Sequence, residues 1–485
     1  MTEQFPLRGY GHLKPLRVQG RYFVYNTVTA ASAEVDARVW VRLRGAGKYD
    51  TPRRGAIDLP PGIEALPAAP PTCAGSVSGP GPRNLILQVS NSCNLRCVYC
   101  CADFGRYGGT FREMSPETAK RGIDFLFAAT VSGQLAVTYF GGEPLLNLDT
   151  VLESARYGLA RAARTGRKLA LHLVTNGVLL DFATLELLDG LGFSLTVSLD
   201  GPARTHNENR PFAGGAASYT PTMLALKAAR SLPIWYRTTV RGTFTRNTAD
   251  FYPVVKFLID GDFSRNIAYE PVFLDRAHPL ALRWRDLPAI KRAYTALARH
   301  YAARLREGDP FCLWDLDDAI IRLVLQEPRQ ARCGSGVTTV TVTAEGDIYG
   351  CHLSTGKEGA WIGTLEQGIA PARKSAWEEV YLQTRPGCSG CWLQALCGGG
   401  CTTHALSYRG GFGQPYRLEC ALIEHRYRLA LWILAEVPEL ADIVRGGLTG
   451  PGNERKGTGH ALAPIWHYVT RAAAVETGPA GGSPC

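Results

Sequence analysis

The sequence has no apolar run that approaches the roughly 20 residues needed by a membrane-spanning helix. Its first residues, MTEQFPLRGYGHLKP, also lack the apolar core of a secretory signal. Hydrophobic residues make up 45% of the 485 residues and charged residues 20%, which is ordinary for a soluble globular protein. We therefore expect a cytoplasmic protein that does not enter a membrane, and the length predicts two or three domains.

Dense clusters of basic residues are missing as well. No run of Lys and Arg, and no patch of them interleaved with aromatic residues, stands out, so nucleic-acid binding is not expected. The net charge is nonetheless +10. A solvated surface spread over a large protein explains this excess, and attraction to an acidic partner is the alternative.

Cysteine is absent from the long stretch between Cys101 and Cys312, although the chain has 14 cysteines. This gap predicts separate sites in separate domains, with Cys73 and Cys485 outside both. Because an export signal is missing, metal or redox chemistry is favoured over disulfides. The first group is Cys93, Cys97, Cys100 and Cys101; the second is Cys333, Cys351, Cys388, Cys391, Cys397, Cys401 and Cys420, preceded by Cys312.

The cysteine-free stretch alternates strand-like apolar segments with helix-like amphipathic ones. The pattern predicts strands at 84–90, 135–140, 169–177, 194–201, 236–245 and 267–274, and helices at 115–130, 148–164, 184–191 and 250–260. Ser115 is a predicted helix N-cap, with Pro116 as the first helical residue. Roughly six β-α units in series predict a parallel sheet that right-handed crossovers curl into a full or partial barrel, with functional loops at the carboxyl ends of its strands.

The sequence before about Pro82 differs from this pattern. RYFVYN and SAEVDARVWVRLR predict two or three short strands and a helix, and a linker rich in Pro, Gly and Ala follows. This extension is either a small winged-helix-like module that pairs an edge strand with a leader peptide, or a cap on the barrel. After about Pro451, Gly and Ala predominate and disorder is expected.

Three cysteines follow the first predicted strand with the spacing C-x3-C-x2-C: Cys93, Cys97 and Cys100. Three thiolates on one loop can bind three irons of a cubic [4Fe–4S] cluster and leave the fourth iron open to a substrate or cofactor. A zinc site is the competing interpretation, but it would need a fourth ligand at close range and no histidine lies near. Cys101 is a poor fourth ligand, because adjacent cysteines do not easily reach the same metal.

This spacing, with the aromatic Tyr99 before the third cysteine, resembles the radical S-adenosylmethionine (radical SAM) enzymes. In that family the open iron binds the methionine end of S-adenosylmethionine (AdoMet), and electron transfer releases a 5′-deoxyadenosyl radical that takes a hydrogen atom from the substrate. YFGGEPLLN matches the family's glycine-rich motif, Gly141-Gly142-Glu143-Pro144, which contacts the methionine amino group. The glycines let backbone carbonyls approach a ligand, and Glu143 can pair with an ammonium group or fix the loop.

The ends of the next two predicted strands carry further residues that the resemblance assigns to the cofactor. Thr175 and Asn176 end one strand, and Ser198 and Asp200 end the next. Ser198 and Asp200 resemble positions that hydrogen-bond the ribose and the carboxylate of AdoMet, and Arg210 could form a charge-assisted pair with that carboxylate. Taken singly, each is equally well explained as a turn residue or a surface charge.

The second cysteine group resembles the SPASM extension of radical enzymes that modify peptides, which usually carries two auxiliary [4Fe–4S] clusters. Its spacings are C-x12-G-x4-C, with Gly346 between, and then C-x2-C-x5-C-x3-C. Cys312 is a candidate fourth ligand of the first auxiliary cluster, and a buried apolar thiol is the alternative. Without that ligand, an open iron could take a substrate thiolate. The resemblance assigns Cys333, Cys351 and Cys401 to the first auxiliary cluster and Cys388, Cys391, Cys397 and Cys420 to the second.

VRGTFTRNTADF and YEPVF resemble the branch of the family that forms thioether bonds in peptides, such as the maturases of six-cysteine peptides and of the quinohaemoprotein amine dehydrogenase small subunit. The implied reaction joins a substrate Cys sulfur to a carbon from which the radical has taken a hydrogen, and an auxiliary cluster accepts the remaining electron. The alternatives are carbon–carbon crosslinking or epimerisation of a peptide, anaerobic sulfatase maturation, and a non-catalytic iron–sulfur electron carrier. Sulfatase maturases often have an aspartate where this sequence has His352, which is a candidate base or, more often for such a histidine, a supporting or surface residue.

The predicted fold class is α/β, with a partial (β/α)6 radical SAM barrel at 81–310 and a cysteine-rich SPASM domain at 311–435. A small α+β extension at 1–80 precedes the barrel, and a tail at 436–485 ends the chain. The expected cofactors are AdoMet and three [4Fe–4S] clusters. The expected partners are a precursor peptide or small protein subunit as substrate, and a reducing flavodoxin- or ferredoxin-type electron donor.

Overall fold

The computed structural model describes residues 4–5, 13–27, 31–46, 57–58, 81–326, 329, 331–382, 385–388 and 391–449. Most of the predicted linker, the tail after Pro451, Cys73 and Cys485 lie outside these residues. Within the described part, none of the helices is long and apolar enough to cross a bilayer.

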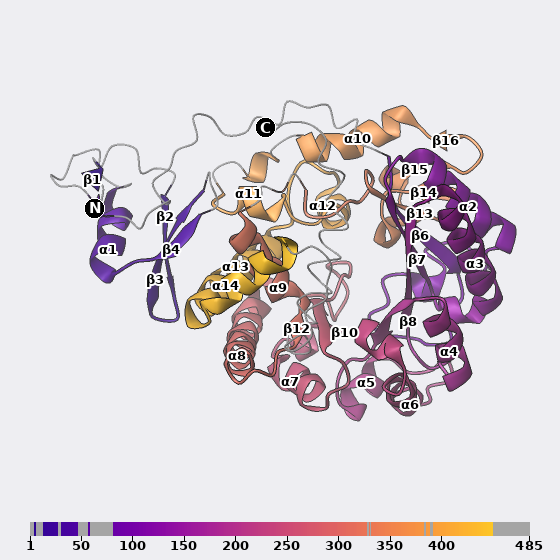
Figure 1. The fold of residues 1–485 in the computed structure, drawn as a ribbon, viewed down its shortest axis with the longest axis horizontal. Coiled ribbons are helices and arrows are strands. Elements are labelled where there is room, and N and C mark those ends of the chain that lie inside the picture. The colour runs from indigo at the N-terminus through magenta and orange to yellow at the C-terminus, as the bar shows by residue number, and fades with distance from the viewer. Residues whose placement is uncertain are drawn as a thin grey trace.

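The centre of the fold is a parallel sheet in which each strand lies beside the next strand of the chain. Its strands are β6 (Asn84–Ser90), β7 (Gln134–Gly141), β8 (Lys168–Thr175), β9 (Ser194–Ser198), β10 (Thr238–Phe244), β11 (Asn266–Pro271) and β12 (Cys312–Leu313). The helices between them are α2 (Pro116–Ala129), α3 (Leu148–Thr165), α4 (Phe182–Gly190), α5 (Ala203–Asn209), α6 (Tyr219–Ala229), α7 (Tyr252–Asp260) and α8 (Leu287–Arg306), and α9 (Trp314–Leu325) follows β12. Figure 1 shows α2 to α8 along the outer rim with the strands inside. The predicted alternation is confirmed, and because β12 lies at one edge of the sheet, the barrel is partial.

Local sequence explains how these elements begin and end. The Ser115 side chain accepts a hydrogen bond of 3.1 Å from the Thr118 amide, and Pro116 begins α2, as predicted. The α3 helix ends at Gly166, whose φ of 66° is the left-handed conformation that favours glycine. The strand predicted at 236–245 is shorter in the structure, because a 3-10 turn at Pro233–Arg237 precedes β10.

The cysteine-rich part of the chain continues the same sheet. The β13 strand (Thr339–Val342) pairs in parallel with β6, and β14 (Asp347–Tyr349), β15 (Trp361–Thr364) and β16 (Gly368–Ile369) follow as antiparallel neighbours. One hydrophobic core runs through the barrel and this extension. The domain boundaries at 310 and 435 stay predictions. The remaining helices are α10 (Pro371–Leu382), α11 (Gln394–Cys397), α12 (Thr402–Arg409), α13 (Arg417–Glu436) and α14 (Glu439–Thr449).

The N-terminal part forms the short strands and the helix that its sequence predicts. An antiparallel sheet of β2 (Leu13–Val18), β3 (Arg21–Asn26) and β4 (Ser32–Glu34) precedes α1 (Ala37–Ala46), and β1 (Gln4–Phe5) pairs with β5 (Ile57–Asp58). The sheet packs on the C-terminal helical region, since Arg21 pairs with Glu436 at 2.8 Å and the ring of Tyr25 lies 5.1 Å from that of Trp392. Recognition of a leader peptide by this part stays a prediction.

Candidate active site

The first cysteine group lies on the loop that leaves the carboxyl end of β6. Burial raises the pKa of the Cys93 thiol to about 11 and that of Cys97 to about 12, and the charges of Cys93 and Cys100 add to the shift at Cys97. The Cys100 sulfur accepts a hydrogen bond of 3.2 Å from the Phe104 amide. The three thiols therefore occupy one half-buried site.

The chemistry of these donors fits an iron–sulfur cluster. Among the described residues, no three Cys, His, Asp or Glu side chains converge as the ligands of a single metal ion do. In a cubic cluster each cysteine binds a different iron, so convergence on one point is not required. Cys93, Cys97 and Cys100 supply three soft ligands on one loop, which suits a [4Fe–4S] cluster with one open iron.

Cys101 differs from its three neighbours in being exposed. Its thiol lies within reach of the charges of Cys100, Arg241 and Lys357. Its exclusion from the ligand set stays a prediction.

The cysteine loop runs beside the segment that follows α5. The Arg96 amide donates to the Pro211 carbonyl at 2.7 Å, and the Val98 amide donates to the Asn209 carbonyl at 2.9 Å. This segment also carries Arg210. These two backbone hydrogen bonds fix the cysteine loop between the ends of β6 and β9. The spacing of the cysteines in the sequence did not predict them.

The glycine motif at the end of β7 packs against the backbone of the cysteine loop. The Gly142 amide donates to the Ser90 carbonyl and the Glu143 amide to the Ser92 carbonyl, both at 2.8 Å. A Cβ atom on Gly142 would lie 2.2 Å from the Ser92 oxygen and 3.1 Å from the Cβ of Cys93. Gly142 is thus needed for this close approach, and a contact of the motif with AdoMet stays a prediction.

Glu143 is fully buried, and its carboxylate connects the ends of β7 and β8. Its carboxylate accepts hydrogen bonds of 2.7 Å from the Thr175 hydroxyl and the Asn176 amide, and one of 3.1 Å from the Leu145 amide. Burial raises the pKa of Glu143 to about 7. Glu143 was expected either to pair with an ammonium group or to fix the loop. These contacts are those of a residue that fixes the loop. Pro144 begins the short 3-10 turn that follows.

Asn176 links the end of β8 to the cysteine loop. Its Nδ2 donates to Asn94 Oδ1 at 2.7 Å and lies 3.9 Å from the sulfur of Cys93. Asn94 was missed in the sequence, because nothing in its position between two cysteines marks it as a partner of a distant strand end.

Asp200 accepts the hydrogen bonds of a buried network beside the cysteine loop. Its Oδ2 accepts hydrogen bonds of 2.5 Å from the Tyr99 hydroxyl and 3.1 Å from Asn209 Nδ2. Its Oδ1 lies 3.0 Å from Arg210 Nε and accepts a bond of 3.1 Å from the Thr243 amide. The Arg210 guanidinium also lies over the Tyr99 ring, 5.4 Å from its centroid. Asp200 and Arg210 thus hold each other, and Asn209 and Thr243 are partners that the sequence did not reveal.

Ser198 and His352 both lie near Arg241 of β10. Ser198 ends β9, is half-buried and pairs with Arg241 of β10. Arg241 forms an ion pair with Glu270 on β11. The His352 ring packs edge-on against Phe140 at 4.6 Å, and burial, with the nearby charge of Arg241, lowers the pKa of His352 to about 4. His352 is therefore neutral at pH 7, and its role as a base stays a prediction.

The second cysteine group divides into two clusters of thiols. Burial raises the pKa of Cys401 most strongly, followed by the charge of Glu419. The charges of Cys333 and Cys351 raise the pKa further. After burial, the charges of Cys397 and Cys391 raise the pKa of Cys388, and the charges of Cys397 and Cys388 raise that of Cys420. The second cluster of thiols is therefore Cys388, Cys391, Cys397 and Cys420. These two sets match the ligand sets expected for the two auxiliary clusters, and the ligation itself stays a prediction.

Glu419 holds the first of these sets in place. Its carboxylate accepts hydrogen bonds of 3.2 Å from the Cys401 amide and 2.8 Å from His404, and Arg332 lies 3.8 Å away. Burial alone would raise the pKa of Glu419, but its contacts with His404, Arg332 and the Cys401 amide outweigh burial and lower that pKa to about 2. Its position before Cys420 was the only signal in the sequence, and it was missed.

Cys312 lies apart from both clusters. It pairs with Asn266, the first residue of β11, and so lies at the amino end of that strand, whereas the first cysteine group follows the carboxyl end of β6. Its thiol is 1% exposed and hydrogen-bonds Asp317. These surroundings favour the alternative in which Cys312 is a buried thiol and not a ligand of the first auxiliary cluster.

Residues 87–257 match the sequence model of the Radical SAM superfamily. An uncharacterized protein of Methanocaldococcus jannaschii, MJ0907, is 29% identical over 179 residues, which span 37% of this chain and 59% of that protein. A serine-type anaerobic sulfatase-maturating enzyme of Klebsiella aerogenes is 24% identical over 68% of this chain and 82% of its own length. A PqqA peptide cyclase of Xanthomonas axonopodis pv. citri is 24% identical, with 68% and 86% covered.

Two solved structures share the fold. The sulfatase maturase anSMEcpe with bound AdoMet superposes with a TM-score of 0.63 at 18% identity, over 75% of this chain and all of that one. Streptococcus suis SuiB bound to its precursor peptide SuiA superposes with a TM-score of 0.52 at 13% identity, over 86% of this chain and all of that one. The fold is therefore that of the radical SAM enzymes, and the partial barrel predicted from the sequence is confirmed. Residues 87–257 are the part of the chain that resembles this superfamily in sequence.

Proposed function

We propose that this chain is a radical SAM maturase that joins a Cys sulfur to a carbon atom within a ribosomally made peptide or a small protein subunit. The observation that carries the proposal is the arrangement of the thiols. One set of three lies at the carboxyl end of β6, and two further sets, around Cys401 and Cys420, lie in the part of the chain that follows the barrel. The peptide-modifying activities named for the relatives support the substrate class.

Cys93, Cys97 and Cys100 would hold the cluster of the radical SAM domain, and AdoMet would lie over the strand ends carrying Gly141, Thr175 and Asp200. When bound, AdoMet and the first cluster supply a radical that takes a hydrogen atom from carbon. The auxiliary clusters supply an acceptor for the second electron. Each thioether bond therefore removes two hydrogen atoms from the peptide. A flavodoxin- or ferredoxin-type protein would supply the electron that starts each turnover.

The chain's own residues keep the site in shape for this reaction. Glu143 fixes the ends of β7 and β8 against each other through Thr175 and Asn176. Tyr99 and Arg210 tie the cysteine loop to Asp200 at the end of β9. Because Asp200 and Glu143 are fully buried, both networks are shielded from water, which strengthens their hydrogen bonds.

Sulfatase maturation is the second candidate, because the chain aligns with the Klebsiella sulfatase-maturating enzyme over 68% of its length. His352 in place of the family's usual aspartate weighs against it. Carbon–carbon crosslinking is supported by the similarity to the PqqA peptide cyclase. The three reactions leave different products.

The test uses iron-loaded protein, a reductant, AdoMet and a Cys-containing peptide encoded beside the gene. We expect 5′-deoxyadenosine, a peptide lighter by two hydrogen atoms per crosslink, and loss of one free thiol per crosslink. A product that reacts with an aldehyde probe would indicate sulfatase-type chemistry, and a crosslink that keeps all free thiols would indicate carbon–carbon bonding. Absence of 5′-deoxyadenosine from fully loaded protein would leave only the electron-carrier alternative.

A further inference from the structure

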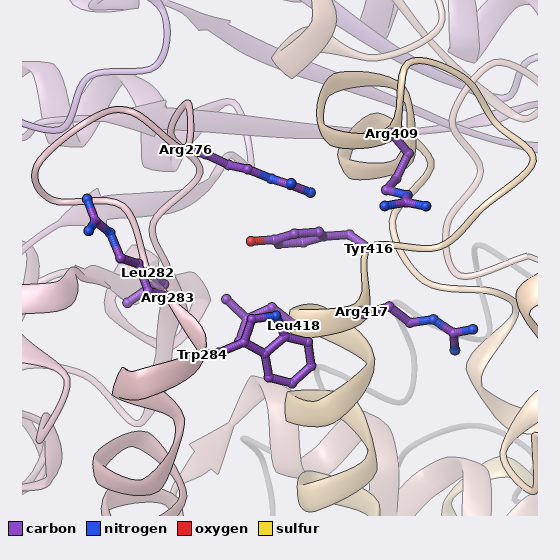
Figure 2. A pocket seen from close by; sticks show the side chains of 8 residues that line it. All are labelled: Arg276, Leu282, Arg283, Trp284, Arg409, Tyr416, Arg417 and Leu418. Carbon is purple, nitrogen blue, oxygen red and sulfur yellow. The ribbon is translucent and has the colours of Figure 1, made fainter.

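A cavity of about 420 Å³ opens between the loop after β11 and the segment that joins α12 to α13. Four arginines line it: Arg276 and Arg283 from the first side, and Arg409 and Arg417 from the second. Figure 2 shows the Arg276 and Arg409 side chains directed toward the ring of Tyr416 from opposite sides, with Trp284 and Leu418 below. The cavity is therefore strongly basic, with an aromatic and apolar floor.

The arginines of this cavity have no ion-pair partner within the described part of the chain. None of the four arginines forms an ion pair with a described carboxylate, whereas Arg241 pairs with Glu270 and Arg426 with Asp315. Arg276 instead lies over the rings of Tyr408 and Tyr416, 5.9 and 5.6 Å from their centroids, and donates to the Tyr408 carbonyl at 3.2 Å. Arginines gathered without anionic partners favour an anionic ligand, because a carboxylate can accept paired hydrogen bonds from a guanidinium group.

Apolar side chains lie between the cavity and the candidate active site, and they contact both. Leu282 lines the cavity and packs with Val272 and Leu274 in a small cluster that also contains Tyr99 and contacts Cys97. Tyr408 forms the other connection, since its hydroxyl donates to the Leu274 carbonyl and its pKa responds to the charge of Cys101. An occupant of the cavity thus lies beside the loop that carries the cysteine trio.

We propose that this four-arginine cavity binds an acidic stretch of the peptide substrate, and so places a neighbouring residue of that peptide at the cysteine loop. The inference rests on the proposed function. Arg276 and Arg409 are directed toward Tyr416, whereas Arg283 and Arg417 extend outward on the two walls (Figure 2). This spread of positive charge, with apolar side chains between, matches acidic side chains alternating with apolar or backbone atoms better than one compact anion. The volume suits a few residues of extended peptide, and the net charge of +10 favours an acidic partner.

The test measures binding to cluster-containing protein without reductant, so that no turnover is needed. The probes are a fluorescein-labelled peptide of alternating Glu and Gly and its matched peptide with Gln in place of Glu. We expect the Glu peptide to bind about tenfold or more tightly than the Gln peptide, because each lost charge-assisted hydrogen bond is worth about that factor. Its affinity should fall with added salt.

Arg409→Glu should weaken binding of the Glu peptide by about tenfold or more, since Arg409 is exposed and its reversal disturbs no described contact. Arg276→Glu should do the same. The matched control is Arg285→Glu, which reverses an exposed arginine two positions from Arg283 that does not line the cavity. It should bind as the parent does.

Equal binding of the Glu and Gln peptides, or equal losses in the Arg409 and Arg285 variants, would overturn the proposal. Displacement of the Glu peptide by ATP at lower concentrations than by unlabelled Glu peptide would assign the cavity to a nucleotide and also overturn it. This binding test and the test of the proposed function can fail separately. If the protein formed no 5′-deoxyadenosine, the difference in affinity between the Glu and Gln peptides could still be measured.

Discussion

The Tyr99 hydroxyl donates a hydrogen bond of 2.5 Å to the Asp200 carboxylate, across 101 positions of sequence. Tyr99 lies between the second and third cysteines of the trio, and Asp200 follows β9. The contact therefore couples the shape of the cluster loop to the strand end expected to hold AdoMet. Arg210 completes the arrangement, because it pairs with Asp200 and covers the Tyr99 ring.

Asp200→Asn should weaken this coupling without removing a side chain. Arg210 would lose its buried anionic partner, and loss of one member of a buried pair typically costs about 3–5 kcal/mol. We expect a lower free energy of unfolding and weaker AdoMet binding, measured by chemical denaturation and by equilibrium dialysis. Arg204→Gln is the control, because its partner Glu208 lies with it on the surface. Unchanged stability in Asp200→Asn would contradict the role given to the pair.

Gly142→Ala should displace the cysteine loop, because the new Cβ would lie 2.2 Å from the Ser92 oxygen. Overpacking of this kind costs about 1–3 kcal/mol. We expect lower iron content and less 5′-deoxyadenosine. Gly133→Ala is the matched control, since no atom lies within 4 Å of a Cβ at that position, and it should keep both. Full iron loading of Gly142→Ala would show that the loop adapts.

Replacement of Cys93, Cys97 or Cys100 by Ala should abolish 5′-deoxyadenosine formation, because each is expected to bind a different iron. Cys101→Ala should leave the cluster intact, as measured by its absorption and by iron analysis. Cys101 is the natural control for the trio, since it is adjacent in sequence and exposed. A cluster lost in Cys101→Ala would place Cys101 among the ligands.

The strands, the helices between them and the partial barrel were predictable because their signals are local. The apolar segment Asn84–Ser90 became β6, and Ser115 with Pro116 gave the start of α2. The grouping of cysteines around Cys401 and Cys420 came from the resemblance to the SPASM extension and not from spacing alone, and the ligation stays a prediction.

The networks that hold the site were not predictable, because they join residues far apart in sequence. Asn94 meets Asn176 across 82 positions, and Asp200 meets the Thr243 amide across 43. The single polar residues involved are common in loops, and no periodicity marks them. The basic cavity around Tyr416 was invisible for the same reason, since its arginines come from two separate segments.

Iron analysis of paired cysteine variants should test the two sets in the extension. Cys388→Ala/Cys420→Ala, a pair within one set, should lose about four irons per chain, and Cys401→Ala/Cys420→Ala, a pair across the sets, about eight. Cys312→Ser should keep the iron of the parent, because its thiol is buried beside Asp317. A loss of about four irons in Cys312→Ser would make Cys312 a ligand.

His206 should give the protein a measurable dependence of stability on pH. The ring is buried, its Nδ1 accepts a hydrogen bond of 3.3 Å from the Asp200 amide, and its Nε2 lies 3.0 Å from the Ser218 hydroxyl. Burial, together with the charge of Arg210, lowers the pKa of His206 from 6.5 to about 4. Between these values the unfolded chain binds a proton that the folded protein excludes, so the folded state loses stability as pH falls.

The loss attributable to His206 between pH 6.5 and pH 4 is on the order of 3 kcal/mol. In His206→Gln this part of the dependence should disappear, and the difference in free energy of unfolding between variant and parent should shift in favour of the variant as pH falls. Urea denaturation at a series of pH values measures both proteins under the same conditions. A constant difference across that range would show that His206 titrates alike in the folded and unfolded states.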